Sequence, residues 1–189
     1  MMDKNRVTIG LLTAAHVRDP SDSVKGIVEK CRNLLESFGY KVEYNGQIQS
    51  SGKGTCEYVA ELKRKGIDAL ILMPTNWVEP PAMLRPLEEI KHLPLMLWGF
   101  PETDEYLDKG LFLGSSSAFA VIKSALEQMD VRHESIMGMP DDQQTQRGVE
   151  QFFTNVCAAI ELAKSAIGLI GYASMGIYTA TFDQLYYGL

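Results

Sequence analysis

A chain of 189 residues has the length of one domain and can bury a sizeable core, so it needs neither disulfides nor a structural metal to fold. Hydrophobic residues make up 46% and charged residues 22%, which is typical of a globular protein and excludes general disorder. The net charge of −6 argues against nucleic acid and against an anionic membrane surface as partners.

Three scattered cysteines, Cys31, Cys56 and Cys157, form neither a disulfide framework nor a zinc cluster. This cysteine content fits a reducing compartment, and we expect a cytoplasmic protein.

No apolar run has the length of a membrane span. The basic residues before the apolar run 7–15 could pass for a signal peptide, but we favour a buried first strand because that run is short and Asp3 lies where positive charge is expected.

Short apolar runs alternate with helical patterns along the chain. The first helical pattern is the clearest, because its apolar residues recur every three or four positions and Ser21 or Asp22 can cap it. Three serines at 115–117 can cap a later helix. In chain order we expect a strand at 7–13, a helix at 24–38, a strand at 41–44, a helix at 55–65, a strand at 68–73, a helix at 82–90, a strand at 93–100, an ambiguous segment at 111–114, a helix at 118–129, an edge strand at 134–139, a helix at 145–165 and a strand at 167–172.

This alternation predicts a doubly wound, flavodoxin-like α/β fold, with a parallel sheet of about five strands and helices on both faces. We expect residues 1–166 to form this Rossmann-like domain and residues 167–189 to be an extra strand or the start of a second domain. The polar stretch 140–146 is the best candidate for a hinge. Ligands of such sheets bind at the carboxyl ends of the strands, which selects loops 14–22, 74–81, 99–105 and 173–179 for inspection.

Most motifs of known chemistry are missing. The first strand lacks the dinucleotide glycine pattern, and G-x-S-x-G does not occur. Residues 46–54 faintly resemble a phosphate loop, but the spacing is one residue too long and Gly54 stands where Ser or Thr should be. Carboxylates are scattered, and we expect Asp141 and Asp142 to be solvated. The residues therefore predict no catalytic group and no metal ligand.

A few residues remain as candidates for binding. His92 and His133 are expected at exposed ends of elements, whereas His16 follows the first strand and is either a ligand contact or a plain loop residue. Trp77 follows a buried strand, where it either covers a small polar ligand or packs under its own loop. Trp98 lies within a strand and is expected in the core.

Four stretches resemble one family in the right order. They are residues 9–11 with 16–18, residues 73–77 (Met-Pro-Thr-Asn-Trp), residues 97–100 (Leu-Trp-Gly-Phe) and residues 170–177, which contain Ser-Met-Gly-Ile. Together they resemble the N-terminal part of the L-fucose/L-arabinose isomerase family, closest to L-fucose isomerase. These enzymes are ketol isomerases that interconvert aldoses and ketoses.

The resemblance implies a substrate-pocket role without a catalytic one. In this family a divalent metal, usually manganese, is held by Glu, Asp and His of the later domains, so manganese is expected in the full-length enzyme and not in this chain. The N-terminal domain walls the sugar pocket of a neighbouring subunit, which makes a small sugar and a homo-oligomer the expected partners. The positions implied as substrate-binding are Arg18 and Trp77, with His16 and Asn76 in the same loops and Met175 at the start of the second domain.

We therefore expect the N-terminal, substrate-pocket and oligomerisation domain of a sugar isomerase of carbohydrate metabolism, inactive on its own. A stand-alone flavodoxin-like module that binds or senses a small ligand is the alternative, and a self-contained α/β enzyme is the weakest. The isomerase hypothesis places Trp77 at the carboxyl edge of the sheet, partly exposed and close to Arg18. The strand expected at 167–172 should either join this sheet or pack against another subunit.

Overall fold

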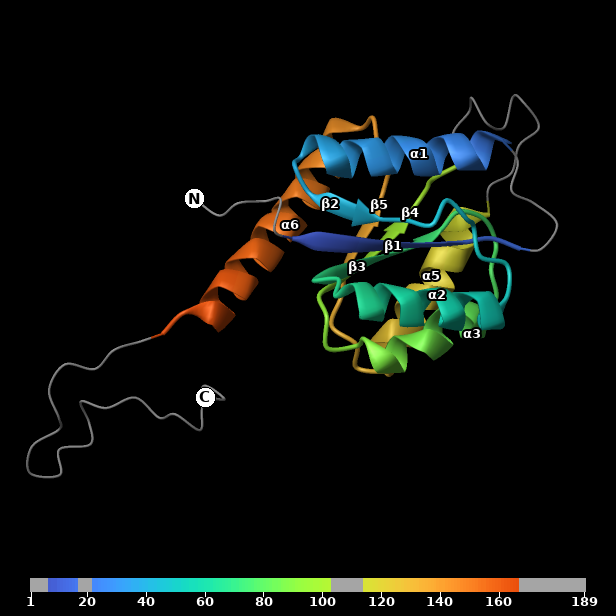
Figure 1. The fold of residues 1–189 in the computed structure, drawn as a ribbon. Helices are drawn as coiled ribbons and strands as arrows, with labels where there is room; N and C mark the ends of the chain where they lie inside the picture. Colours follow the sequence, from blue (N-terminus) through green and yellow to red (C-terminus); the bar gives the residue numbers. More distant parts are fainter. Residues whose placement is uncertain (1–6, 17–21, 103–113, 167–189) are drawn as a thin grey trace, which may run out of the picture.

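The computed structural model describes residues 7–16, 22–102 and 114–166 of the chain (Figure 1). They form a five-stranded, all-parallel sheet with helices on both faces, which is the predicted doubly wound, flavodoxin-like fold. The strands are β1 (Thr8–Ala14), β2 (Lys41–Glu43), β3 (Ala69–Pro74), β4 (Leu95–Gly99) and β5 (Glu134–Met137). The helices are α1 (Asp22–Ser37), α2 (Gly52–Lys65), α3 (Pro80–Leu84), the 3-10 helix η2 (Arg85–Glu89), α5 (Ser115–Gln128) and α6 (Gln143–Lys164).

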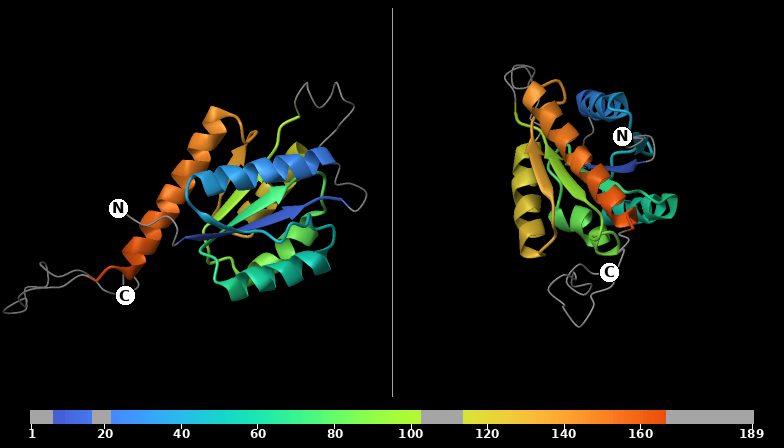
Figure 2. Two further views of the ribbon diagram at one scale, coloured as in Figure 1. Left: turned by 45° about the horizontal axis from the view of Figure 1, so that its top comes forward. Right: turned by 90° about the vertical axis from the view of Figure 1, so that its left-hand side faces the viewer.

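The strand order β2-β1-β3-β4-β5 separates the helices into two layers (Figure 2). One face of the sheet is covered by α1 and α6, whose apolar residues form a single core with Ile9, Ile71 and Trp98. The other face is covered by α2, α3, η2 and α5, which pack on Leu12, Leu72 and neighbouring strand residues. Successive side chains of a strand point to opposite faces of the sheet, and helices cover both faces. Every side chain of β3 is therefore buried, which explains why β3 is apolar throughout.

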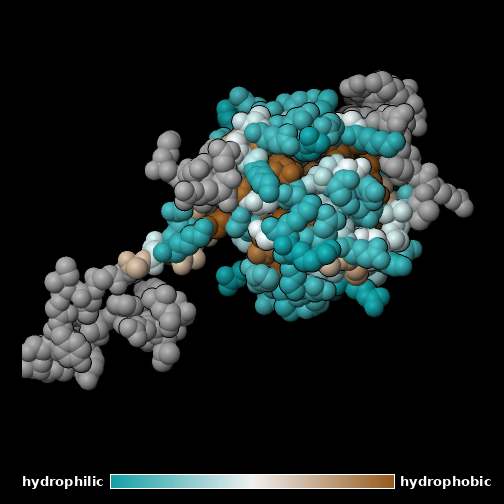
Figure 3. All heavy atoms as spheres, viewed as in Figure 1, coloured by the Kyte–Doolittle hydropathy of each residue, from teal (hydrophilic) through white to brown (hydrophobic). Residues whose placement is uncertain are grey.

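The surface reflects this layering. On the face viewed in Figure 3, hydrophilic residues cover the outer sides of the helices, and hydrophobic residues show mainly between the two helix layers. Among the described residues, no helix combines the length and the apolar character needed to cross a membrane. The cysteines Cys31, Cys56 and Cys157 are all free thiols.

The predicted helix over residues 82–90 is wrong in its bounds. α3 begins earlier, at Pro80, and gives way at Arg85 to the 3-10 helix η2. A proline fits the first turn of a helix because its missing N–H has no partner there anyway. Pro86 therefore starts a new short helix instead of continuing the old one.

The predicted helix over residues 55–65 begins three residues earlier than expected. Ser51 is its N-cap, and its hydroxyl oxygen accepts a hydrogen bond from the Gly54 N–H at 3.1 Å. The helix ends as predicted at Gly66, which has a φ of 69°. The expected start at residue 55 did not take this serine cap into account, although serine is a favoured N-cap residue.

The serines at 115–117 do not cap α5. Its N-cap is Gly114, with a φ of 64°, and Ser115 is already helical. The Ser115 hydroxyl instead donates to the carbonyl of Pro74 and accepts from the Phe100 N–H at 2.9 Å. It thereby joins the carboxyl ends of β3 and β4.

The polar stretch 140–146 is a short turn at 140–142 followed by the first residues of α6, and not a boundary between two bodies. Asp142 caps α6 by accepting from the Thr145 N–H at 2.8 Å, and α6 packs against the same sheet as α1. Residues 167–189, for which a further strand or domain is predicted, lie outside the described residues.

Candidate functional site

The strand order places a topological switch point between β1 and β3. The chain leaves β1 toward α1 on one face of the sheet and leaves β3 toward α3 on the other. These strands pair in register from Ile9 opposite Ala69 to Ala14 opposite Pro74, so they end level with each other. In open α/β sheets the crevice at this point is where ligands bind.

The ends of β1 and β3 are tied together by Thr75. Both its N–H and its hydroxyl donate to the carbonyl of Ala14, at 3.0 and 3.1 Å. Thr75 is buried, whereas the next two residues, Asn76 and Trp77, come progressively to the surface. The loop that follows β3 therefore has a rigid base and an exposed tip.

A third segment reaches this edge from β2. After β2 the chain returns to β1, where the Gln49 N–H donates to the Thr13 carbonyl and the Gln49 carbonyl accepts from the Ala15 N–H, both at 2.9 Å. Ser50 and the cap residue Ser51 follow directly. The start of α2, which is the positive end of the helix dipole, is thereby placed beside the end of β1.

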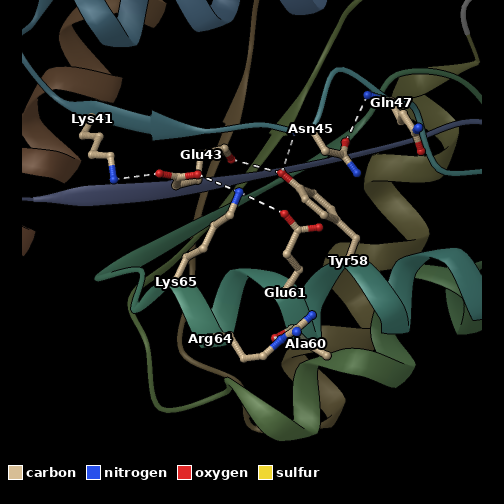
Figure 4. Close-up of polar contacts among 9 residues, drawn as sticks. All are labelled: Lys41, Glu43, Asn45, Gln47, Tyr58, Ala60, Glu61, Arg64 and Lys65. Atoms are coloured by element: carbon tan, nitrogen blue, oxygen red, sulfur yellow. Dashed lines mark hydrogen bonds and ion pairs between the residues drawn. The ribbon is translucent and has the colours of Figure 1, made fainter.

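Figure 4 shows what holds this returning segment. The Tyr58 hydroxyl, from α2, donates to the carbonyl of Glu43 at 3.1 Å and accepts from the Asn45 N–H at 3.2 Å. Burial is the main reason why the pKa of Tyr58 lies well above its ordinary value. The phenol therefore stays protonated and keeps both hydrogen bonds.

Ion pairs strengthen the same connection (Figure 4). Glu43 binds Lys41 at 2.7 Å and Lys65 of α2 at 2.9 Å. Hydrogen bonds from Lys41 and then Lys65 lower the pKa of the Glu43 carboxyl. Lys65 also contacts Glu61, one helical turn earlier, at 2.9 Å.

These segments enclose a small cleft of about 160 Å³ at the switch point. His16 follows β1, Ser50 and Ser51 precede α2, and Glu79 follows β3. The complete lining is Ala15, His16, Ser50, Ser51, Gly52, Val78, Glu79 and Ala82. Imidazole, hydroxyl and carboxylate groups offer both donors and acceptors, which suits a polar ligand with several hydroxyl groups.

Trp77 immediately precedes the lining residue Val78 in the chain but is not itself part of the lining, and 41% of its surface is exposed. Its N–H donates to the side-chain oxygen of Asn76 at 2.6 Å, which fixes the turn. The turn rests on Gly114, where a Cβ atom would lie 3.2 Å from the Trp77 nitrogen. The Gly114 N–H in turn donates to the Glu102 carboxylate at 2.8 Å, after β4.

The structure brings together three of the five residues predicted to bind substrate. His16, Asn76 and Trp77 all lie at the carboxyl ends of β1 and β3, and the side-chain oxygen of Asn76 is engaged within its own loop. Arg18 and Met175 lie outside the described residues. Sequence reasoning missed the cleft residues Ser50, Ser51 and Glu79, of which only Ser51 carried a signal, as a helix cap.

The other candidates lie elsewhere. His92 is exposed, and His133 uses its Nδ1 to contact the carbonyl of Val131 at 2.8 Å, at the opposite end of the sheet. Trp98 is fully buried, as predicted, and its indole N–H donates to the Gly138 carbonyl at 2.9 Å.

The described residues do not fit a metal centre. Nowhere in the described ranges do three His, Cys, Asp or Glu side chains gather in a way that could hold a metal ion. At the cleft only His16 and Glu79 are of ligating type. These side chains therefore suit binding through hydrogen bonds and apolar contact, and no step through manganese is derived for them.

Comparison with known proteins adds little. No protein-family model and no curated protein matches the chain. Among solved structures, one similar chain is a sugar-binding transcriptional regulator of the LacI family from Enterococcus faecalis, 14% identical, with a TM-score of 0.33. The match covers 88% of this chain but only 64% of the regulator chain. At that TM-score the similarity carries no argument.

Proposed function

We propose that this chain is the N-terminal domain of a metal-dependent aldose–ketose isomerase. In this proposal it walls the sugar pocket, takes part in oligomer formation and is inactive on its own. The observation that carries the proposal is a half-exposed tryptophan one residue before the lining of a polar cleft, at the switch point between β1 and β3. The flat apolar face of Trp77 suits the C–H side of a sugar ring, and the cleft suits its hydroxyl groups.

The positions of the segments that resemble the isomerase family support this proposal. Residues 9–11, 73–77 and 97–100, far apart in sequence, fall in or directly after β1, β3 and β4, which are neighbours in the sheet. Two of these strands end at the cleft, and the third, β4, is followed by Glu102, which is bound to Gly114 beneath the Trp77 turn. A pocket wall built from these loops is consistent with that clustering.

The handedness of the fold limits where the chain could rejoin this sheet after residue 166. α6 lies on the same face as α1, and α1 connects β1 to β2 in the opposite direction along the sheet from the other crossovers. A right-handed crossover through α6 would return the chain toward β4, whose two sides are already occupied by β3 and β5, so the free position in that direction is the outer edge of β2, at the far end of the sheet. α6 also extends well beyond the sheet (Figures 1 and 2). We therefore expect residues 167–172 to leave this sheet.

Saturation-transfer NMR with L-fucose, L-arabinose and D-arabinose tests the proposal on the purified chain. We expect weak binding that Trp77→Ala reduces several-fold. Val121→Ala is the matched control, because Val121 on α5 is 43% exposed and far along the chain from the cleft residues. Equal binding by wild type and Trp77→Ala would overturn the assignment of the pocket.

Two further results bear on catalysis. With manganese added, the chain should form no ketose from these sugars, and measurable turnover would contradict the proposal. The encoding frame should remain open beyond Leu189 and encode further Glu, Asp and His residues. A stop codon there would favour the stand-alone ligand-binding module.

A further inference from the structure

The second half of α6 presents an apolar side that the sheet does not cover. Beside α6, at the end of the sheet where β4 and β5 begin, a groove of about 190 Å³ is open to the surface. It is lined by Pro94, Glu134, Phe152, Asn155, Val156 and Ala159. Beyond this groove α6 extends past the sheet (Figures 1 and 2). The groove therefore belongs to a surface separate from the polar cleft, which lies at the other ends of the strands.

This side of α6 remains uncharged beyond the sheet. The α6 residues that line the groove recur every three or four positions, so they share one side of the helix. The same spacing continues with Leu162, Ala163 and Ala166. Leu162 is 73% exposed, while its charged neighbours Glu161 and Lys164 lie on other sides of the helix by the same spacing. The sides of a helix that face water normally carry polar residues, so this uncharged side is suited to a contact.

The chain that follows α6 is almost uncharged. Residues 167–189 contain one charged side chain, Asp183, whereas 22% of the residues of the whole chain are charged. The segment begins with Ile-Gly-Leu-Ile-Gly-Tyr at 167–172. A segment of this composition needs a surface on which to bury its apolar side chains.

Connectivity brings the start of this segment to the groove. Ser165 has extended backbone angles, with a φ of −73° and a ψ of 141°, so the chain leaves the helix there. Asn155 lies about 16 Å before Ala166 along the helix axis, at a rise of about 1.5 Å per residue. Six extended residues span about 20 Å. Residues 167–172 are therefore long enough to run back along α6 as far as the groove.

We propose that residues 167–172 pack against α6 of their own copy, on the uncharged side that runs from Leu162 to the groove at Asn155. α6 then serves two packed layers: Val149 and Phe153 contact the core on the sheet, and the uncharged side contacts the segment that follows. Tethering favours this segment over a second copy, because residues joined to α6 are present at a far higher effective concentration. The contact does not involve the polar cleft, so it goes beyond the sugar-pocket proposal.

Methyl NMR of the full chain tests the contact directly. We expect nuclear Overhauser effects from the methyl groups of Ala159 and Leu162 to those of Leu169 and Ile170, which are too far along the chain for a contact within one helical turn. In an equal mixture of labelled and unlabelled chains, isotope-filtered spectra should show none of these effects between copies. Their absence from the fully labelled chain, or their appearance between copies, would overturn the proposal.

Limited proteolysis with chymotrypsin tests the same contact by mutation. Cleavage after Leu169 and Tyr172 requires the segment to detach from α6, so we expect it to be at least tenfold faster in Leu162→Lys than in wild type. Val121→Lys is the matched control, because Val121 is also an exposed apolar residue, 43% exposed, but lies on α5. Its cleavage should match wild type, and circular dichroism should show that both variants are folded.

Equal cleavage rates in wild type and Leu162→Lys, or the same acceleration in Val121→Lys, would contradict the proposed contact. Neither experiment measures sugar binding, so this proposal and the sugar-pocket proposal can fail separately.

Discussion

One tryptophan lies within β4 and the other follows the neighbouring strand β3, and the two show opposite uses of the same side chain. Trp98 lies within β4, is fully buried and satisfies its indole N–H inside the domain, at the carbonyl of Gly138. Trp77 lies just past the end of β3 and leaves 41% of its surface exposed, although its backbone is fixed by Asn76 and Gly114. Trp98 thus stabilises the fold, whereas Trp77 is held rigidly without being used by the fold, which is typical of a binding surface.

The largest effect should come from the buried side of this comparison. Trp98→Ala opens a cavity in the core between the sheet and α6, and we expect a loss of about 3–5 kcal/mol in the free energy of unfolding. Urea denaturation measures this loss. Trp98→Phe, which retains most of the volume, should lose clearly less, and equal losses would show that the indole volume is not what Trp98 contributes.

The support beneath Trp77 should have an intermediate effect. Gly114→Ala forces a Cβ into a left-handed backbone conformation, with a φ of 64°, and toward the Trp77 nitrogen. We expect a loss of about 1–2 kcal/mol and a changed signal of the Trp77 indole in NMR spectra. Gly46→Ala is the control, because its φ is 74° but nothing lies near its Cβ position. It should be similarly strained and leave the Trp77 signal in place.

The pH dependence of stability should reveal the connection between β2 and α2. Because the pKa of Glu43 is lowered from its ordinary value of 4.5 in the folded state, its ionised form stabilises the fold above that value. This contribution is lost as the pH falls through the lowered pKa. Glu43→Gln should therefore lower the urea midpoint at neutral pH and differ less from wild type in acid.

Glu57→Gln controls for a general effect of removing a carboxylate from α2. Its ion pair with Lys53, at 3.8 Å, lies on the exposed surface and should contribute little. A Glu43→Gln variant that is as stable as Glu57→Gln at neutral pH would show that the ion pairs of Glu43 do not hold the returning segment.

The smallest effect on stability should come from Trp77 itself. Trp77→Ala removes a side chain that is already half exposed, and we expect the free energy of unfolding to change by no more than about 0.5 kcal/mol. Urea denaturation beside Trp98→Ala provides the direct comparison. A loss of several kcal/mol would mean that Trp77 is packed into its own domain.

The sequence was informative where periodicity decides the structure. Alternating apolar runs and helical patterns gave the parallel sheet, the two helix layers and the burial of Trp98. The sequence was less informative where a single hydrogen bond determines the local structure. At Ser115, for example, the hydroxyl joins two strand ends instead of capping a helix. Ser50 reaches the cleft because Gln49 pairs with the end of β1, and Glu79 reaches it because β3 ends level with β1. Both are contacts between distant segments that no local pattern encodes.

The indole N–H signals of the two tryptophans provide the most direct test of the sugar pocket. In a titration of the chain with L-fucose followed by NMR, we expect the Trp77 signal to move with increasing sugar while the Trp98 signal stays. Trp98 is the internal control, because it is fully buried and bound to Gly138. A Trp77 signal that does not move at saturating sugar, or that moves equally with a non-sugar polyether of similar size, would contradict the account.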